Sequence, residues 1–311
     1  MTDLQLMAHW IFVASSSFGF QPGDSLHWQR DVTQLACDFP FLMHGILAVS
    51  ALSKSRSVPP SECQFWLWTA AHHQNKALPA YRQIIGEAEQ YMNEQNCHAV
   101  MATGYLICVY AGFAVTSSGA YGTYGQGQCT IPELLEFFSL MRGARSIMSY
   151  KTQWAMNGPM AMYLRQWPSV IDVSLNPHDE RIADLTAVFD RVESSPGEQI
   201  HSDADVYRTT LMLLREAFAV PFQPVDGVGW KLALMTWVER IPQRYLELLS
   251  DSKPEALLIL GYFAVLPKRC ALQDWYAEGA AERVLSMVCN SLGEQWSHWL
   301  AWPMEEIGAN S

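Results

Sequence analysis

The segment from residue 99 to 115, AVMATGYLICVYAGFAV, constrains the fold most, because it carries no charged side chain and is apolar on every side. It lies within a longer stretch without Asp, Glu, Lys or Arg that reaches Pro132. A helix that is apolar all round must be buried, either in a protein core or in a lipid bilayer. This segment is near the lower length limit for a membrane span and lacks flanking Lys or Arg anchors. The sequence therefore predicts a deeply buried core helix and no membrane span.

The composition agrees with a large apolar core. Hydrophobic residues make up 50% of the 311 positions and charged residues only 16%, whereas a typical soluble domain is about 25% charged. The chain has 20 basic and 31 acidic residues, a net charge of −11, and no run of Lys or Arg. Because a nucleic-acid-binding surface needs clustered positive charge, we expect no direct binding of nucleic acid by this chain.

Cysteine and histidine spacing predicts neither a disulfide framework nor a metal centre. The seven cysteines are widely spaced and form no CxxC pair, which argues against a multi-cysteine zinc site. His72 and His73 are adjacent, so on a helix they point about 100° apart and cannot share one metal ion as an i, i+4 pair does. We expect no metal and no cofactor. The N-terminus lacks the basic region of a secretory signal, and we expect an intracellular protein, cytoplasmic or nuclear.

Helical periodicity dominates the sequence, and no convincing run of alternating strands occurs. We predict an all-α fold, a single multi-helix domain over residues 1–311, with a flexible glycine-rich loop at about 116–131. Asp38, Ser61 and Thr130 are the expected caps of three helices. The predicted helices cover residues 40–53, 61–90, 99–115, 130–145, a segment from 179 or 184 to 192, 203–220, 228–249 with a possible kink at Pro242, 254–265 and 272–300.

Four segments in the same order resemble blocks of a known family, the C-terminal regulatory domain of fungal zinc-cluster transcription factors. They are WQRDVTQLACDFPFLMHGILAVSALS at 28–53, HHQNKALPAYR at 72–82, ILGYFAVLPK at 259–268 and WYAEGAAERVLSMVCNSLGEQWSHWLAWPMEEIG at 275–308. The last segment resembles the end of the sterol-uptake-control branch, down to WPMEEIG. The resemblance extends over nearly the whole chain.

This resemblance implies an all-helical module with an internal apolar pocket. In the sterol-uptake-control branch the pocket takes a sterol, and its occupancy controls an attached DNA-binding domain. Those factors also carry an N-terminal cluster of six cysteines that binds two zinc ions, and this sequence does not contain it. Either the sequence is a piece of a longer factor or it encodes a free-standing pocket, and a start at Met1 favours the second interpretation.

A few polar side chains in apolar segments are candidates for chemistry. His44 lies in FLMHGIL and is either a core histidine with one hydrogen bond or a polar anchor and proton-transfer group. Arg145 either pairs with a carboxylate such as Glu136 or binds a polar group of a ligand. Most aromatic residues belong to the core, and some offer a flat wall with one polar handle. The candidate catalytic residues are His44, Tyr105 and Arg145, and the candidate ligand-binding residues are Met43, His44, Leu47, Tyr105, Tyr110, Met141, Arg145, Tyr262 and Trp275.

Three functions remain open at this level. The first is binding of a rigid apolar small molecule, such as a sterol or terpenoid, by shape and a few oriented polar groups. The second is a cofactor-free enzyme of secondary metabolism that catalyses a cyclisation, pericyclic reaction or isomerisation by holding a reactive conformer. The third is a regulator that acts through protein partners, as a homodimer or with complete factors. The sequence has no GxSxG, GxGxxG or GxxxxGK[ST] motif that would favour other chemistry.

Overall fold

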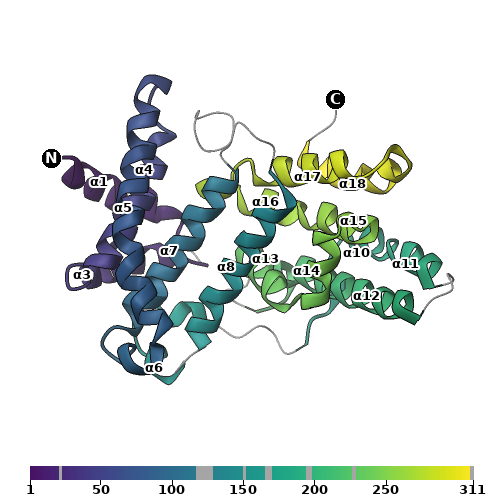
Figure 1. Ribbon diagram of the computed structural model, residues 1–311, viewed down its shortest axis with the longest axis horizontal. Coiled ribbons are helices and arrows are strands. Elements are labelled where there is room, and N and C mark those ends of the chain that lie inside the picture. Colours follow the sequence, from purple (N-terminus) through teal and green to yellow (C-terminus); the bar gives the residue numbers. More distant parts are fainter. Residues whose placement is uncertain are drawn as a thin grey trace. The chain divides into compact units, whose positions relative to one another are not determined.

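The computed structural model is all-α, as predicted (Figure 1). It describes residues 1–20, 23–116, 129–149, 152–164, 170–193, 198–225 and 229–308, and no strand occurs in those ranges. The chain divides into two compact units. Two units can belong to one module, so a single domain over residues 1–311 stays a prediction. The predicted glycine-rich loop at about 116–131 falls mainly on residues 117–128, which lie outside the described residues.

The first unit comprises Met1–Gly127, Ser139–Gln166 and Gln273–Tyr276. α8 and a 3-10 turn at Trp275–Ala277 contribute residues to both units. The helices of the first unit are α1 (Thr2–Phe12), α2 (Asp24–Leu26), α3 (Thr33–Ala36), α4 (Pro40–Ser55), α5 (Pro60–Gly86), α6 (Ala88–Tyr91), α7 (Cys97–Thr116), the end of α8 (Ile131–Ser149), α9 (Thr152–Ala155), a π-helical turn at His27–Val32 and 3-10 turns at Ala14–Ser17 and Ala161–Leu164.

Helix α7 is the buried centre of the first unit. Among the described residues it is the one helix that is long and apolar enough to cross a membrane, and 72% of its Cys97–Ala114 window is buried inside the protein. It packs against α4, which also packs on α5 and α1 (Figure 1). The expectation of a core helix is therefore confirmed. Gly104 lets α5 approach α7 closely, because a Cβ there would lie 2.7 Å from the Tyr81 hydroxyl.

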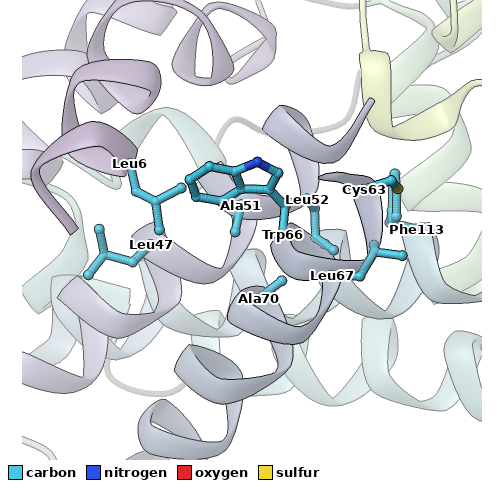
Figure 2. Packing of buried hydrophobic residues seen from close by; sticks show 9 residues of the cluster. All are labelled: Leu6, Leu47, Ala51, Leu52, Cys63, Trp66, Leu67, Ala70 and Phe113. Atoms are coloured by element: carbon cyan, nitrogen blue, oxygen red, sulfur yellow. The ribbon is translucent and has the colours of Figure 1, made fainter. Parts of the chain in front are cut away.

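A cluster of buried apolar side chains joins α1, α4, α5 and α7, and we call it the α4–α5 cluster. In Figure 2 the Trp66 ring lies at its middle, between Leu6 at one end and Phe113 at the other. Each fully buried Leu, Phe or Met side chain stabilises a fold by about 1.5–3 kcal/mol. The cluster consists of Leu6, Leu47, Ala51, Leu52, Cys63, Trp66, Leu67, Ala70 and Phe113, with Met7, Met43, Val58, Tyr110 and Trp275 packed against it.

The second unit comprises Gln128–Phe138, Trp167–Leu272 and Ala277–Ser311. Its central helix is α15, in which every residue from Ala256 to Phe263 is buried. Its helices are the start of α8, α10 (Asp179–Ala183), α11 (Thr186–Glu193), α12 (Glu198–Ala219), α13 (Trp230–Arg240), α14 (Gln243–Ser250), α15 (Pro254–Phe263), α16 (Val265–Cys270), α17 (Ala280–Ser291), α18 (Ala301–Ile307) and 3-10 turns at Val173–Leu175, Val220–Phe222 and Glu294–Leu300.

The expected helix caps are only partly correct. Thr130 and Glu133 form a reciprocal cap: the Thr130 main-chain N–H donates to Glu133 Oε2 at 3.0 Å, and Thr130 Oγ1 accepts from the Glu133 N–H at 3.4 Å. Asp38 and Ser61 cap nothing, because α4 and α5 begin one residue after Phe39 and Pro59, with a proline in the first turn of each. A proline there already fixes φ for the helix and has no N–H to satisfy.

Two long predicted helices are broken in the structure. Residues 228–249 form α13 and α14, which are separated at Ile241 and Pro242 because a proline cannot donate to the preceding turn. Residues 272–300 contain only α17 as regular α-helix, preceded by Gly279 at φ +79° and followed by the 3-10 turn at Glu294–Leu300. The predicted helix at 203–220 begins earlier, at Glu198.

Candidate functional site

All but one of the predicted site residues lie in the first unit. Met43, Leu47, Tyr110 and Trp275 belong to the α4–α5 cluster or pack against it. The predicted residues are thus divided between this apolar cluster, a group of buried tyrosines around Tyr105 and Arg145, and a histidine pair that contains His44. Met141 is buried on α8, one helical turn before Arg145, and Tyr262 lies in the second unit.

The group around Tyr105 is a chain of hydrogen-bonded hydroxyls, which we call the tyrosine network. Trp28 Nε1 donates to the Tyr163 hydroxyl at 2.8 Å, and the Tyr105 and Tyr276 hydroxyls lie 3.1 Å apart. The Tyr163 and Tyr105 side chains are also hydrogen-bonded. Because an indole N–H can only donate, the Tyr163 oxygen accepts from Trp28 and its own proton is left for Tyr105. In the bond between Tyr105 and Tyr276 either hydroxyl can be the donor.

Aromatic rings enclose this network. The Tyr105 ring centroid lies 4.8 Å from that of Tyr163, 5.5 Å from that of Trp28 and 5.8 Å from that of Phe18. Phe18 also packs on Tyr276 at 5.7 Å. Tyr105 is only 4% exposed. Ring pairs at these separations and tilts are the favoured arrangement of aromatic side chains, so the hydroxyls form a polar line inside an apolar shell.

The hydroxyls of the tyrosine network are neutral at physiological pH. Burial raises the pKa of Tyr105 and of Tyr163 well above the usual value of 10.0. Tyr276 raises the pKa of Tyr105 further, and Tyr105 raises that of Tyr163, while the hydrogen bonds from Tyr163 to Tyr105 and from Trp28 to Tyr163 act in the opposite direction. The buried carboxyls of Asp274 and Asp24 act in the same direction on the pKa of Tyr105 and Tyr163 respectively. A neutral phenol offers a hydrogen-bond donor, so Tyr105 is suited to bind or protonate an acceptor oxygen and unsuited to act as a base.

Arg145 adds a main-chain contact to the same region. Its Nη1 donates to the carbonyl oxygen of Tyr163 at 3.1 Å. This bond fixes the 3-10 turn at Ala161–Leu164, which carries Tyr163, to helix α8. Arg145 therefore positions a member of the tyrosine network.

His44 forms a pair with His73 on α5. Their Nδ1 atoms lie 3.0 Å apart, so one ring donates and the other accepts. Burial lowers the pKa of both rings, Lys76 and His72 lower it further, and Asp3 raises it. His73 Nε2 lies 3.6 Å from Asp3 Oδ1. Because the pKa of both rings is lowered, the pair is neutral at physiological pH.

Sequence reasoning did not select the partners of Tyr105. Two of the three hydrogen bonds of the network join residues separated by 135 and 171 positions, and Tyr163 belongs to a short 3-10 turn with no helical periodicity. No spacing rule connects positions so far apart. In the described part of the chain, no group of three or more His, Cys, Asp or Glu side chains is placed to hold a metal ion, and all seven cysteines are free thiols.

Comparison with known proteins gives the family context. No family model matches the chain. Over 98% of its length the chain is 25% identical to a "Zn(2)-C6 fungal-type transcription factor" of Gibberella zeae, and the match covers 61% of that protein. Along nearly its whole length, the chain is therefore similar to a fungal transcription factor of this type. A match of 109 residues, 34% of the chain, is 32% identical to "Sterol uptake control protein 2" of Candida albicans and covers 14% of that protein.

These matches confirm the resemblance expected from the four sequence blocks. The chain spans less than two thirds of the length of either relative, at 61% and 14%. The described residues form an all-helical fold. The tyrosine network and the α4–α5 cluster lie in the same compact unit of that fold.

Proposed function

We propose that this domain binds a rigid apolar small molecule, such as a sterol or terpenoid, in its first unit. The observation that carries the proposal is the neutral hydroxyl of Tyr105, enclosed by aromatic rings and hydrogen-bonded to two further tyrosines. A ligand of this class presents a large apolar surface and one hydroxyl or carbonyl group. The tyrosine network would bind that group, and the neighbouring apolar residues would contact the body of the molecule.

The segment Gln273–Tyr276 links the two groups of side chains. Trp275 packs on Phe113 of the α4–α5 cluster with 6.1 Å between ring centroids, and the next residue, Tyr276, belongs to the tyrosine network. This segment is held to residues 14–17 by hydrogen bonds from Trp275 Nε1 to the Ala14 carbonyl at 3.3 Å and from Ser17 Oγ to the Gln273 carbonyl at 3.0 Å. We propose that a ligand enters where these two segments separate.

The expected affinity comes mainly from apolar contact. Burial of about 300 Å² of apolar ligand surface contributes roughly 7 kcal/mol before ordering costs. A hydrogen bond between neutral groups adds about 0.5–1.5 kcal/mol. Shape would therefore set the affinity, and the tyrosine network would select ligands that carry an oxygen at the correct end.

The first experiment is native mass spectrometry of the purified protein, followed by extraction of any bound compound under denaturing conditions. We expect a stoichiometric apolar mass. Binding of cholesterol is then compared with that of cholestane, which lacks the hydroxyl group. Tyr105→Phe should weaken cholesterol binding about threefold to tenfold and leave cholestane binding unchanged. Tyr91→Phe, outside both groups of residues, is the matched control.

Two results would contradict this proposal. One is a purified protein that carries no apolar compound and whose melting temperature neither sterol changes. The other is equal affinity of the Tyr105→Phe variant and the wild type for cholesterol, since the hydroxyl would then play no part in binding.

A second candidate function is a cofactor-free enzyme of secondary metabolism on the same fold. It is favoured by the chain of neutral hydroxyls between Trp28 and Tyr276, because a neutral phenol can donate to oxygen that gains negative charge in a cyclisation or isomerisation. Time-resolved mass spectrometry of the extracted compound, after it is returned to the protein, tests for conversion to an isomer. Tyr105→Phe should then lower kcat more than it raises KM. A compound that is recovered unchanged contradicts this function.

We also propose an intracellular location, cytoplasmic or nuclear. The free state of all seven cysteines supports it, as does the match to a protein that is called a transcription factor. Homodimer formation, or binding to a complete factor, stays a prediction.

A further inference from the structure

The second unit contains an aromatic group of its own around Trp302 in α18. The rings of Tyr262, His178 and Phe218 lie 5.3, 5.5 and 5.7 Å from the Trp302 ring, measured between centroids. Tyr262 is the one predicted ligand-binding residue that lies in this unit. Burial, with a smaller contribution from Asp184, raises the pKa of Tyr262 to about 12, so its hydroxyl is neutral at physiological pH.

Two buried donors in this region have no acceptor among the described residues. They are the indole N–H of Trp302 and the side-chain amide of Asn176, whose residues are only 5% and 3% exposed. Both residues contact His178. Asn176 Oδ1 accepts a hydrogen bond from the His178 main-chain N–H at 3.1 Å, and the His178 ring packs on Trp302. Buried polar groups are almost always satisfied, so these donors indicate an acceptor that is not part of the described protein.

The charges around this site favour a neutral acceptor. Glu306 pairs with Arg269, and its Oε1 lies 3.9 Å from His178 Nε2. Arg181 pairs with Glu305 at 3.5 Å. With Asp184 close to Tyr262, acidic groups outnumber basic ones here, so a carboxylate or phosphate would be repelled. The apolar faces of Trp302, Tyr262 and Phe218 instead favour an apolar body that carries one oxygen.

We propose that Trp302 and Asn176 bind the carbonyl or hydroxyl oxygen of a small neutral molecule. The molecule enters beside His178, whose side chain is 34% exposed. The site belongs wholly to the second unit and shares no residue with the tyrosine network, so it does not depend on ligand binding in the first unit.

The test uses the full chain labelled with ¹⁵N at tryptophan, which gives one NMR signal for each indole N–H. The probe is cyclohexanone, and the matched control ligand is methylcyclohexane, which lacks the oxygen. Trp302→Phe assigns the Trp302 signal by removing it. We expect cyclohexanone to shift this signal with saturation and the hydrocarbon to leave it unchanged. The signal of Trp237, whose indole N–H already donates to the Thr210 carbonyl at 3.4 Å, should not move.

Affinity measurements on variants complete the test. Trp302→Phe keeps an aromatic ring and removes the donor, so cyclohexanone should bind about threefold to tenfold more weakly. Trp299→Phe, in the 3-10 turn before α18, is the matched control and should bind as the wild type does. Asn176→Asp keeps the oxygen that accepts from His178 and replaces the amide donor. It should also weaken binding, and it provides a second variant if Trp302→Phe fails to fold.

Three results would overturn the proposal. The first is absence of a saturable shift of the Trp302 signal with cyclohexanone. The second is wild-type affinity of both donor variants. The third is a Trp302 indole proton that exchanges magnetisation with water even at saturating cyclohexanone, since a structural water would then be the acceptor.

Discussion

Replacement of Tyr105 by Phe is the most direct test of the tyrosine network as a structural unit. The substitution removes one oxygen atom and keeps the ring, so the contacts with Trp28, Phe18 and the Tyr163 ring are preserved. It removes the hydrogen bond to Tyr163 and the one to Tyr276, whose hydroxyl lies 3.1 Å away. Tyr105 and Tyr163 are buried and Tyr276 is partly buried, so water cannot reach the Tyr163 side of the lost hydroxyl without a rearrangement.

The expected loss of stability follows from these two bonds. A hydrogen bond between neutral groups contributes about 0.5–1.5 kcal/mol net, so Tyr105→Phe should lower the free energy of unfolding by about 1–3 kcal/mol. A structural role of the ring alone predicts almost no change, because the ring is retained. The size of the loss therefore separates the hydroxyl from the ring.

Urea unfolding followed by far-UV circular dichroism measures this difference. The slope with denaturant should stay constant, so that a shifted midpoint reports stability. Tyr91→Phe, for which the structure records no hydroxyl hydrogen bond, should change stability by at most about 0.5 kcal/mol. A cycle with Tyr276→Phe should give a coupling free energy of about 0.5 kcal/mol or more. A Tyr105→Phe variant within 0.5 kcal/mol of the wild type would refute the reasoning.

Three further substitutions test other parts of the fold. Gly104→Ala places a methyl group 2.7 Å from a buried tyrosine hydroxyl and should cost about 1–3 kcal/mol in calorimetry; an unchanged melting temperature would contradict this close approach. Arg215→Lys replaces two hydrogen bonds to the Asp179 carboxylate, of 2.8 and 2.6 Å, by one contact. It should lower the free energy of unfolding by about 0.5–1 kcal/mol, and by less at high salt. Unchanged stability in urea unfolding would contradict a contribution from the paired bonds. Burial lowers the pKa of His44 and His73 below 6.5, so the unfolded chain binds protons more readily and stability should fall as pH drops below about 6.5. His44→Gln should reduce this slope, and an unchanged profile would exclude the pair as its source.

The fold class and the central helix could be predicted because their signals are local and large. A helix such as α7, apolar on all sides, has only one stable environment in a protein without a membrane, and the structure buries it. Helix starts were less accurate, because a proline in the first turn of α4 and α5 competes with a capping side chain. The prediction that Thr130 caps a helix was correct, because Glu133 completes a reciprocal cap with it.

The candidate site could be predicted only in part. Tyr105 was selected because tyrosine combines a flat ring with one polar group. Its partners Trp28, Tyr163 and Tyr276 were not selected, because they are far apart in the sequence and only the tertiary fold brings them together. A contact between Arg145 and the Tyr163 main chain also has no sequence signal, because every residue carries the same carbonyl group.

The buried polar groups of the two units have one property in common, which bears on ligand chemistry. The hydroxyls of Tyr105 and Tyr163, like the indole N–H of Trp302, are neutral donors surrounded by aromatic rings. A charged ligand loses its hydration on entering such surroundings and needs an opposite charge in return. A neutral alcohol or ketone loses much less and is matched by one donated hydrogen bond. Both units should therefore prefer a neutral oxygen compound to the carboxylate of the same shape.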